Sequence, residues 1–215
     1  MCLIPNRLAL KLKNLTVTDL IAKLRVAMGQ SGSESSDFDL NPETVLPAGR
    51  KLRSAGVLVA VSVADGVPKV ILTKRSSALK HHPGQIAFAG GKQDPGDVDA
   101  TATALREAFE EIGLPTGLAQ VLGTLPCHET VTGFRVTPVV AILAQEFTIT
   151  PEPGEVAEVF QVPLAHLVNP DNYLIESRIW RGVRRYYYVV PYGPYYVWGA
   201  TARMLRGLAE RMAQA

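Results

Sequence analysis

One amphipathic stretch, residues 100–112, limits what this chain can fold into, because its apolar stripe must be buried against a second layer. Its apolar side chains recur at positions i, i+3, i+4 and i+7: Leu105, Ala108, Phe109 and Ile112. This spacing predicts an α-helix with one buried face. Asp97 or Asp99 can cap its start, while Gly113 occupies the C′ position and Pro115 prevents a restart.

Strand-like runs on both sides of this helix supply the second layer. Residues 56–63 are nearly all apolar, and Asp65-Gly66 is a hairpin signal before a second strand at 69–74. Further strands are expected at 118–124, 134–143, 157–161 and 185–190. A final amphipathic helix is expected at about 197–212, with an apolar side formed by Leu205, Leu208 and Met212. We therefore expect the α/β (α+β) class, a mixed sheet with helices packed on it.

The first fifty residues differ in composition from the rest. Residues 16–28 show helical spacing, and residues 30–47 are rich in Ser, Asp, Glu and Pro, which predicts a linker or mobile segment. We expect a helical N-terminal extension with its linker at 1–50 and one compact domain at 51–215. Three roles stay open for the extension: covering the sheet, reaching a partner subunit, or regulating access to a site.

Charge and hydropathy argue against two broad classes. The chain has 22 basic and 20 acidic residues, a net charge of +2, and this balance argues against a nucleic-acid binder with a basic face. No apolar run approaches the roughly 18 residues of a membrane-spanning helix. The N-terminus also lacks the unbroken apolar stretch of a secretory signal. We expect a cytoplasmic protein that binds neither nucleic acid nor membranes.

The polar side of helix 100–112 is unusually acidic. Glu107, Glu110 and Glu111 lie on adjacent turns of one face, where like charges cost about 0.2–0.5 kcal/mol per pair. They also crowd the negative end of the helix dipole, which costs about 0.3–1 kcal/mol per charge. Arg106 can pair with Glu110 but cannot neutralise three carboxylates. A solvated acidic face is the simpler alternative, but Mg²⁺ or Mn²⁺ suits such carboxylates and often bridges to phosphates.

These residues resemble a known motif. Residues 91–114, GKQDPGDVDATATALREAFEEIGL, are similar to the Nudix box, in which a glycine and a spaced acidic residue precede Arg-Glu-apolar-x-Glu-Glu-x-Gly-apolar. The matching positions of the second half are Arg106, Glu107, Ala108, Glu110, Glu111, Gly113 and Leu114. Asp97 stands where the general pattern has Glu, with one extra residue before Arg106.

The segment upstream narrows the resemblance. Residues 71–97, ILTKRSSALKHHPGQIAFAGGKQDPGD, resemble the motif of the coenzyme A pyrophosphatase branch of the Nudix hydrolases. The matching positions are Leu72, Thr73, Arg75, Ser76, Gly84, Phe88, Gly90 and Gly91. Lys80 replaces an arginine and loses its planar fork, and Ala89 replaces the proline. The whole resemblance covers about residues 53–207.

The resemblance implies a fold, an activity and a site. The fold would be a Nudix-type α/β/α sandwich with a mixed sheet. The activity would be metal-dependent hydrolysis of the pyrophosphate bond of coenzyme A or its derivatives, giving 3′,5′-ADP and (acyl-)4′-phosphopantetheine. The implied metal ligands for Mg²⁺ or Mn²⁺ are Glu107, Glu110 and Glu111; the implied catalytic residues are Arg106, Glu107 and Glu110; the implied substrate-binding residues are Arg75, Lys80, Gly90 and Gly91.

Two details of that site stay open. The general base is Glu110, or a later glutamate, Glu155 or Glu158; the third choices are His81, His82 and His128, each more simply a hydrogen-bonding surface residue. The extra 3′-phosphate of coenzyme A could meet a basic cluster, which is otherwise a solvated loop: Lys74, Arg75, Lys80, His81 and His82.

Aromatic residues gather late in the chain. All seven tyrosines and both tryptophans follow residue 172. They could sandwich adenine or build a homodimer interface, although filling the core beneath the last helix is the simpler interpretation.

Two other functions are weighed against the coenzyme A reading. One is a Nudix hydrolase of another nucleoside diphosphate derivative, such as ADP-ribose, NADH or a nucleotide sugar. The other is a non-catalytic Nudix module that binds a nucleotide or acyl-CoA. Since Glu107, Glu110 and Glu111 are all present, we favour an enzyme with a small nucleotide substrate.

Overall fold

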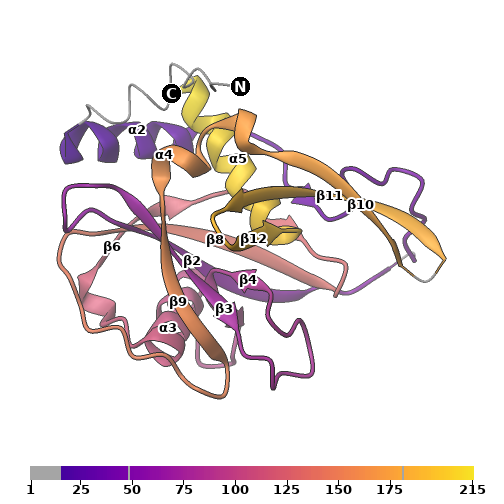
Figure 1. Ribbon diagram of the computed structural model, residues 1–215, viewed down its shortest axis with the longest axis horizontal. Helices are drawn as coiled ribbons and strands as arrows, with labels where there is room; N and C mark the ends of the chain where they lie inside the picture. The colour runs from indigo at the N-terminus through magenta and orange to yellow at the C-terminus, as the bar shows by residue number, and fades with distance from the viewer. Residues whose placement is uncertain (1–15, 48, 181) are drawn as a thin grey trace.

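A nine-stranded mixed sheet forms the centre of the molecule, with helices on both faces, and a separate three-stranded antiparallel sheet accompanies it (Figure 1). The computed structural model describes residues 16–47, 49–180 and 182–215. The large sheet contains β1 (Ser35–Ser36), β2 (Arg53–Ser62), β3 (Lys69–Arg75), β4 (Ile86–Ala87), β5 (Ala89–Lys92), β6 (Ala119–Thr124), β7 (His128–Glu129), β8 (Phe134–Leu143) and β9 (Val156–Pro163). The small sheet contains β10 (Leu174–Trp180), β11 (Val183–Tyr192) and β12 (Tyr195–Trp198). The α-helices are α2 (Val17–Gly29), α3 (Ala100–Ile112), α4 (Leu164–Leu167) and α5 (Ala200–Gln214), and short 3-10 helices cover Thr116–Leu118 and Pro170–Asn172.

Strand β2 is the central strand and has partners on both edges. It pairs with β8 in parallel, and with β3 and β5 in antiparallel fashion. The predicted hairpin after Asp65-Gly66 is confirmed, since β2 and β3 meet there and Gly66 takes a positive φ of 77°. The mixed sheet expected from the strand pattern is therefore present.

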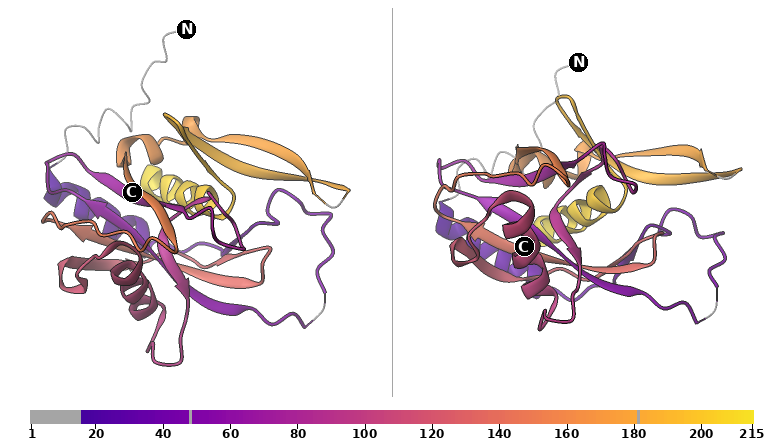
Figure 2. Two further views of the ribbon diagram at one scale, coloured as in Figure 1. Left: turned by 60° about the horizontal axis from the view of Figure 1, so that its bottom comes forward. Right: turned by 90° about the horizontal axis from the view of Figure 1, so that it is seen from below.

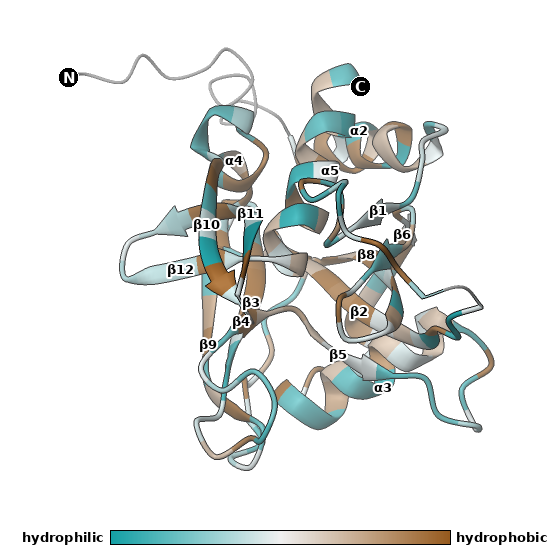
Figure 3. Ribbon diagram, turned by 90° about the vertical axis from the view of Figure 1, so that its right-hand side faces the viewer, coloured by the Kyte–Doolittle hydropathy of each residue, from teal (hydrophilic) through white to brown (hydrophobic). Residues whose placement is uncertain are grey.

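The two faces of β2 build two different cores. Leu58 and Ala60 pack with Ala104 and Ala108 of α3, whereas Val59 on the opposite face belongs to the core under α2 and α5. Figures 2 and 3 show α3 on one side of the sheet and α2 and α5 on the other. Because successive strand residues alternate in direction, a continuous apolar run is what a strand buried on both faces requires. The expected α/β/α sandwich is confirmed.

Helix α3 has the predicted caps but a rotated buried face. Asp99 accepts a hydrogen bond from the Ala102 N–H at 2.8 Å, and Gly113 ends the helix at φ 71°. Phe109 was expected inside and is 57% exposed, whereas Glu111, expected on the polar side, is 4% exposed. The helix lies so close to β2 that a Cβ on Gly56 would come within 2.2 Å of the Ala100 carbonyl oxygen. Such a close contact suits alanines, so the large Phe109 ring faces solvent.

The C-terminal part differs from the prediction in four elements: α4, β10 and β12 were not predicted, and α5 begins later than expected. Helix α5 begins at Ala200 and not at 197, because β12 occupies Tyr195–Trp198 and Gly199 turns the chain at φ 65°. Strand β10 was not predicted; most of its residues are exposed, so it lacks a buried side with a clear apolar repeat. Outside this part, the short strands β1, β4, β5 and β7 were also not predicted, whereas each of the six predicted strands is present. The predicted apolar side of α5 is buried.

The N-terminal segment packs against the domain. Thr16 and Asp19 form a capping box at the start of α2, and Leu20 and Leu24 are buried in the same core as α5. The stretch expected to be a linker contains β1, which pairs in parallel with β7. None of the helices in the described ranges is long and apolar enough to cross a membrane.

Candidate active site

Glu111 is the most deeply placed carboxylate of helix α3. It is 4% exposed, and its Oε2 accepts a hydrogen bond from the Gly90 N–H at 3.2 Å. Burial is the main cause that raises the pKa of Glu111 to about 8, and the neighbouring Glu107 and Glu155 carboxylates contribute to the rise. A buried carboxylate beside two others is a costly arrangement unless a positive charge joins it.

Glu107 lies one helical turn before Glu111 and contacts Gly91 of strand β5. A Cβ on Gly91 would come within 2.5 Å of the Glu107 Oε1 atom, so only glycine leaves room for this carboxylate. Burial raises the pKa of Glu107, while Arg106 opposes the rise and Glu155 adds to it. Strand β5 therefore approaches the acidic helix at its two glycines, Gly90 and Gly91.

Arg106 organises the outer side of this cluster. Its Nε and Nη2 donate to the two carboxylate oxygens of Asp97 at 3.0 and 2.9 Å. Its Nη1 donates to Glu110 at 2.8 Å, the predicted i, i+4 pair, and lies 3.0 Å from Glu107 Oε1. The guanidinium holds the pKa of Asp97 well below its usual range. Asp97 thus anchors the arginine, which in turn holds two of the glutamates.

Replacing Arg106 should displace the carboxylates that it holds without removing any of the glutamates. We expect Arg106→Lys to lower kcat about tenfold, because an ammonium cannot reproduce the planar fork that joins Asp97 to the two glutamates. Steady-state kinetics of the purified variant would measure this. Arg135→Lys is the matched control, since Arg135 pairs with Glu34 at an exposed position far along the chain. An unchanged kcat for Arg106→Lys would contradict the positioning role.

The carboxylates suit a hard divalent cation, although they do not surround one point. In the described part of the chain, no three His, Cys, Asp or Glu side chains converge as a ready-made metal site. Arg106 draws Glu107 and Glu110 toward itself, while Glu111 turns inward to Gly90. The donor set nevertheless fits Mg²⁺ or Mn²⁺, because hard divalent cations bind carboxylate oxygens, and the charges of Glu107 and Glu155 already raise the pKa of Glu111.

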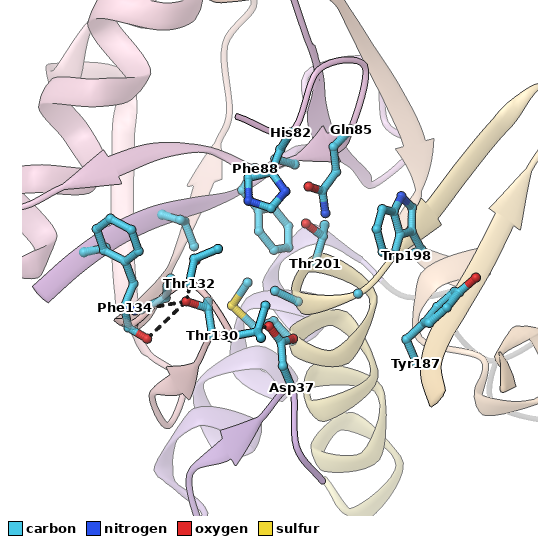
Figure 4. Close-up of a pocket in the computed structure, with 18 of the residues that line it drawn as sticks. Asp37, His82, Gln85, Phe88, Thr130, Thr132, Phe134, Tyr187, Trp198 and Thr201 are labelled. Carbon is cyan, nitrogen blue, oxygen red and sulfur yellow. Dashed lines mark hydrogen bonds between the residues drawn. The ribbon is translucent and has the colours of Figure 1, made fainter. Parts of the chain in front are cut away.

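A cavity of about 460 Å³ opens beside the two glycines (Figure 4). It extends from Gly90 and Gly91 on β5 to Trp198 on the small sheet, and Thr201 of α5 lies between them. Its charged lining is strongly unbalanced: Arg75, Lys92, Arg178 and Arg185 against Asp37. A chain with a net charge of only +2 thus places four cations around one cavity, which favours an anionic ligand.

The structure brings together most of the site residues proposed from the sequence. Gly90, Gly91 and Arg75 line the cavity. Glu107 and Glu111 contact the two glycines, and Arg106 joins Glu107 to Glu110. Lys80 is exposed and outside the cavity lining. Of the basic cluster considered for the 3′-phosphate, only Arg75 and His82 line the cavity.

The candidate bases lie in different surroundings. Glu158 accepts a hydrogen bond from the Tyr195 hydroxyl, whose ring stacks on Phe160. Glu155 is exposed and close enough to Glu107 and Glu111 to raise the pKa of both. His128 is not the expected surface residue: it is fully buried.

Asp37 and Asn41, from the stretch expected to be a linker, line the cavity, and the buried His128 contacts Asp37. The ring Nδ1 of His128 lies 2.9 Å from Ser35 Oγ, and its Nε2 lies 3.1 Å from Asp37 Oδ1. Asn41 reaches the small sheet, donating to the Tyr186 carbonyl at 2.9 Å and accepting from the Tyr186 N–H at 2.8 Å. Sequence reasoning missed this contribution, since a Ser/Asp-rich stretch carries no signal for distant partners.

Aromatic residues of the C-terminal part divide between core and cavity. Tyr173 is buried and Tyr188 is packed against the core, as the simpler interpretation expected. Tyr187 and Trp198 line the cavity instead, with their ring centroids 5.2 Å apart. Sequence reasoning missed this arrangement because neither β10 nor β12 was predicted as a strand.

Comparison with known proteins identifies the family of this chain. Residues 52–181 match the NUDIX domain family. The chain is 36% identical over 197 residues to the "Uncharacterized Nudix hydrolase NudL" of Escherichia coli K12, covering 92% of this chain and 95% of that protein. It is 41% identical over 162 residues to the protein of the same name from Cronobacter sakazakii, covering 75% and 84%. The solved NUDIX domain of Shewanella oneidensis NrtR complexed with ADP ribose is 17% identical, with a TM-score of 0.48 and coverage of 81% and 94%. The chain therefore belongs to the Nudix hydrolase family, whose members act on pyrophosphate bonds of small nucleotide derivatives and generally need a divalent metal ion, typically Mg²⁺ or Mn²⁺.

Proposed function

We propose that this Nudix hydrolase cleaves the pyrophosphate bond of coenzyme A or its derivatives, releasing 3′,5′-ADP and (acyl-)4′-phosphopantetheine. One observation carries the proposal. Gly90 and Gly91 meet the carboxylates of α3 and also line the cationic cavity, so the acidic cluster adjoins a site suited to phosphates. The upstream motif that contains Arg75 supports the coenzyme A branch in particular.

The acidic cluster provides the metal site in this proposal. Glu107, Glu110 and Glu111 would hold Mg²⁺ or Mn²⁺. The bound cation would offset phosphate charge and lower the pKa of a water ligand. Arg106 acts on this site through Glu107 and Glu110, which it orients by charge-assisted hydrogen bonds.

Two other residues complete the proposed site, one acting on the attacking water and one on the substrate. Glu155 is the favoured general base, since Glu158 is engaged by Tyr195 and Glu110 by Arg106. Arg75 is the favoured pyrophosphate ligand. Its Nε is shielded from solvent, and within the described residues it has no hydrogen-bond partner, so an anion in the cavity would satisfy it. Lys80 is not part of the proposed binding site, because it is not among the residues that line the cavity.

A product assay tests the proposal. The purified chain would be incubated with coenzyme A, ADP-ribose, NADH and a nucleotide sugar, each with Mg²⁺, Mn²⁺ or a chelator, and the products separated by chromatography. We expect 3′,5′-ADP from coenzyme A only when metal is present. Preferred cleavage of another substrate would refute the coenzyme A assignment while keeping Nudix chemistry. No cleavage of any of the four by folded protein would favour the binding module.

A further inference from the structure

Two arginines face each other across the small sheet. Arg178 on β10 and Arg185 on β11 are direct cross-strand partners, so their side chains leave the sheet on the same side. Both line the cavity described above. Like charges directly opposite each other destabilise a strand pair, and natural sheets usually place opposite charges there. The pair is therefore unfavourable for the sheet by itself and needs a compensating contact.

Aromatic rings support the two guanidinium groups but do not neutralise them. The Cζ atom of Arg178 lies 4.7 Å from the centroid of the Trp198 ring, and that of Arg185 lies 4.6 Å from the Trp180 ring. Stacking of this kind fixes the plane of a guanidinium and leaves its edge available for hydrogen bonds.

Within the part of the chain that the structure describes, the arginine pair has no anionic partner. Among residues 16–47, 49–180 and 182–215, neither guanidinium lies within ion-pair distance of a carboxylate. Glu176 is on the same side of β10, but its carboxylate accepts the Tyr196 hydroxyl hydrogen bond. The Nε of Arg185 is shielded from solvent and has no hydrogen-bond partner among these residues, as is true of Arg75 Nε.

The position of the arginine pair in the cavity indicates which part of the substrate it would contact. The cavity joins the glycines beside the acidic helix to the small sheet, so a ligand cleaved at the glycines extends toward Arg178 and Arg185. The wall beside the arginines presents the rings of Tyr187 and Trp198, which Figure 4 shows together at one end of the cavity. A phosphate next to a flat heterocycle matches this combination of guanidinium groups and aromatic rings.

We propose that Arg178 and Arg185 bind the 3′-phosphate of the ADP half of the substrate, with its adenine against Tyr187 and Trp198. This rests on the proposed function and adds a phosphate subsite formed by the small sheet. A phosphomonoester dianion between the two guanidinium groups would turn their repulsion into attraction and would occupy the unpartnered Arg185 Nε. The basic loop around Lys80 is then a solvated surface.

The first arm of the test compares coenzyme A with dephospho-coenzyme A, which lacks the 3′-phosphate. The measured quantity is the ratio of their kcat/KM values in the presence of Mg²⁺. We expect the wild type to favour coenzyme A, and Arg178→Gln and Arg185→Gln each to lower the ratio about 10- to 100-fold. Arg184→Gln is the matched control, because Arg184 is next in sequence but leaves the other side of β11 and donates to Ser177 Oγ at 3.0 Å. It should keep the wild-type ratio.

The second arm measures binding without turnover, so it does not depend on the proposed reaction. Isothermal titration with 3′,5′-ADP and with 5′-AMP, in the presence of a chelator, should show tighter binding of 3′,5′-ADP by the wild type. That advantage should disappear in Arg178→Gln and Arg185→Gln, and circular dichroism would check that both variants are folded. A wild type with no preference, or variants that lose both ligands equally, would overturn the 3′-phosphate assignment. If coenzyme A is not cleaved but the preference exists, only the proposed reaction fails.

Discussion

Glu111→Gln is expected to lower the metal-dependent kcat about 10³-fold or more while the fold is retained. The substitution removes one charged oxygen ligand from the proposed metal site, whose contribution to the transition state is several kcal/mol. The glutamine oxygen can still accept the hydrogen bond from the Gly90 N–H, which Glu111 accepts at 3.2 Å. Since Glu111 is 4% exposed, an uncharged amide there should not lower the melting temperature. Kinetics at several Mg²⁺ concentrations and a thermal melt measure both quantities.

The matched control for this experiment is Glu146→Gln, the same chemical change at an exposed position. Its kcat and melting temperature should stay at the wild-type values. If Glu111→Gln retains wild-type turnover at saturating Mg²⁺, the assignment of Glu111 as a metal ligand is wrong. Loss of the folded state would instead show that its carboxylate is needed for structure.

Gly91→Ala is expected to lower kcat about 10²-fold. The added Cβ would come within 2.5 Å of Glu107 Oε1 and within 2.6 Å of its Cδ, so the carboxylate must move. A displacement of about 1 Å in a catalytic group can cost about this factor. The KM should change less than kcat, because the cavity wall itself keeps its backbone. Steady-state kinetics would separate the two effects.

Gly96→Ala provides the comparison, because a Cβ there has nothing within 4 Å. It adds the same methyl group to the same loop region and should leave kcat unchanged. Equal kinetics for the two variants would show that the contact between Gly91 and Glu107 has no part in catalysis.

The fold was predicted correctly where a long, regular apolar pattern marks an element. It was predicted incorrectly where the pattern allows more than one arrangement or where no pattern is present. Strands buried on both faces, such as β2 and β8, are recognisable because a long apolar run has few other uses. The buried face of α3 was predicted incorrectly, because the spacing of its apolar residues is compatible with more than one buried face. The close approach of the helix to β2 at Gly56 determines which face is buried. Strand β10 is exposed along most of its length, so no buried face marks it in the sequence.

The predicted site was more complete near the motif than away from it. Residues 90–111 are close in sequence, and their contacts follow from one loop and one helix. Arg178 and Asp37 reach the same cavity from distant segments, and no local spacing reveals such contacts. The domain boundary near residue 50, the cytoplasmic location and the homodimer stay predictions.

The parallel pairing of β2 with β8 has a consequence for the chain while it is being synthesised. One edge of β2 is covered early, because β3 and β5 follow it closely. The other edge stays unpaired until β8 is synthesised. That strand follows about 80 residues later, which takes roughly 4–16 s at a synthesis rate of about 5–20 residues per second. Until then a strand with two apolar faces keeps a row of unpaired N–H and C=O groups, an arrangement open to pairing with a neighbouring nascent chain. The central strand of the finished sheet is therefore open to intermolecular pairing until β8 has been made.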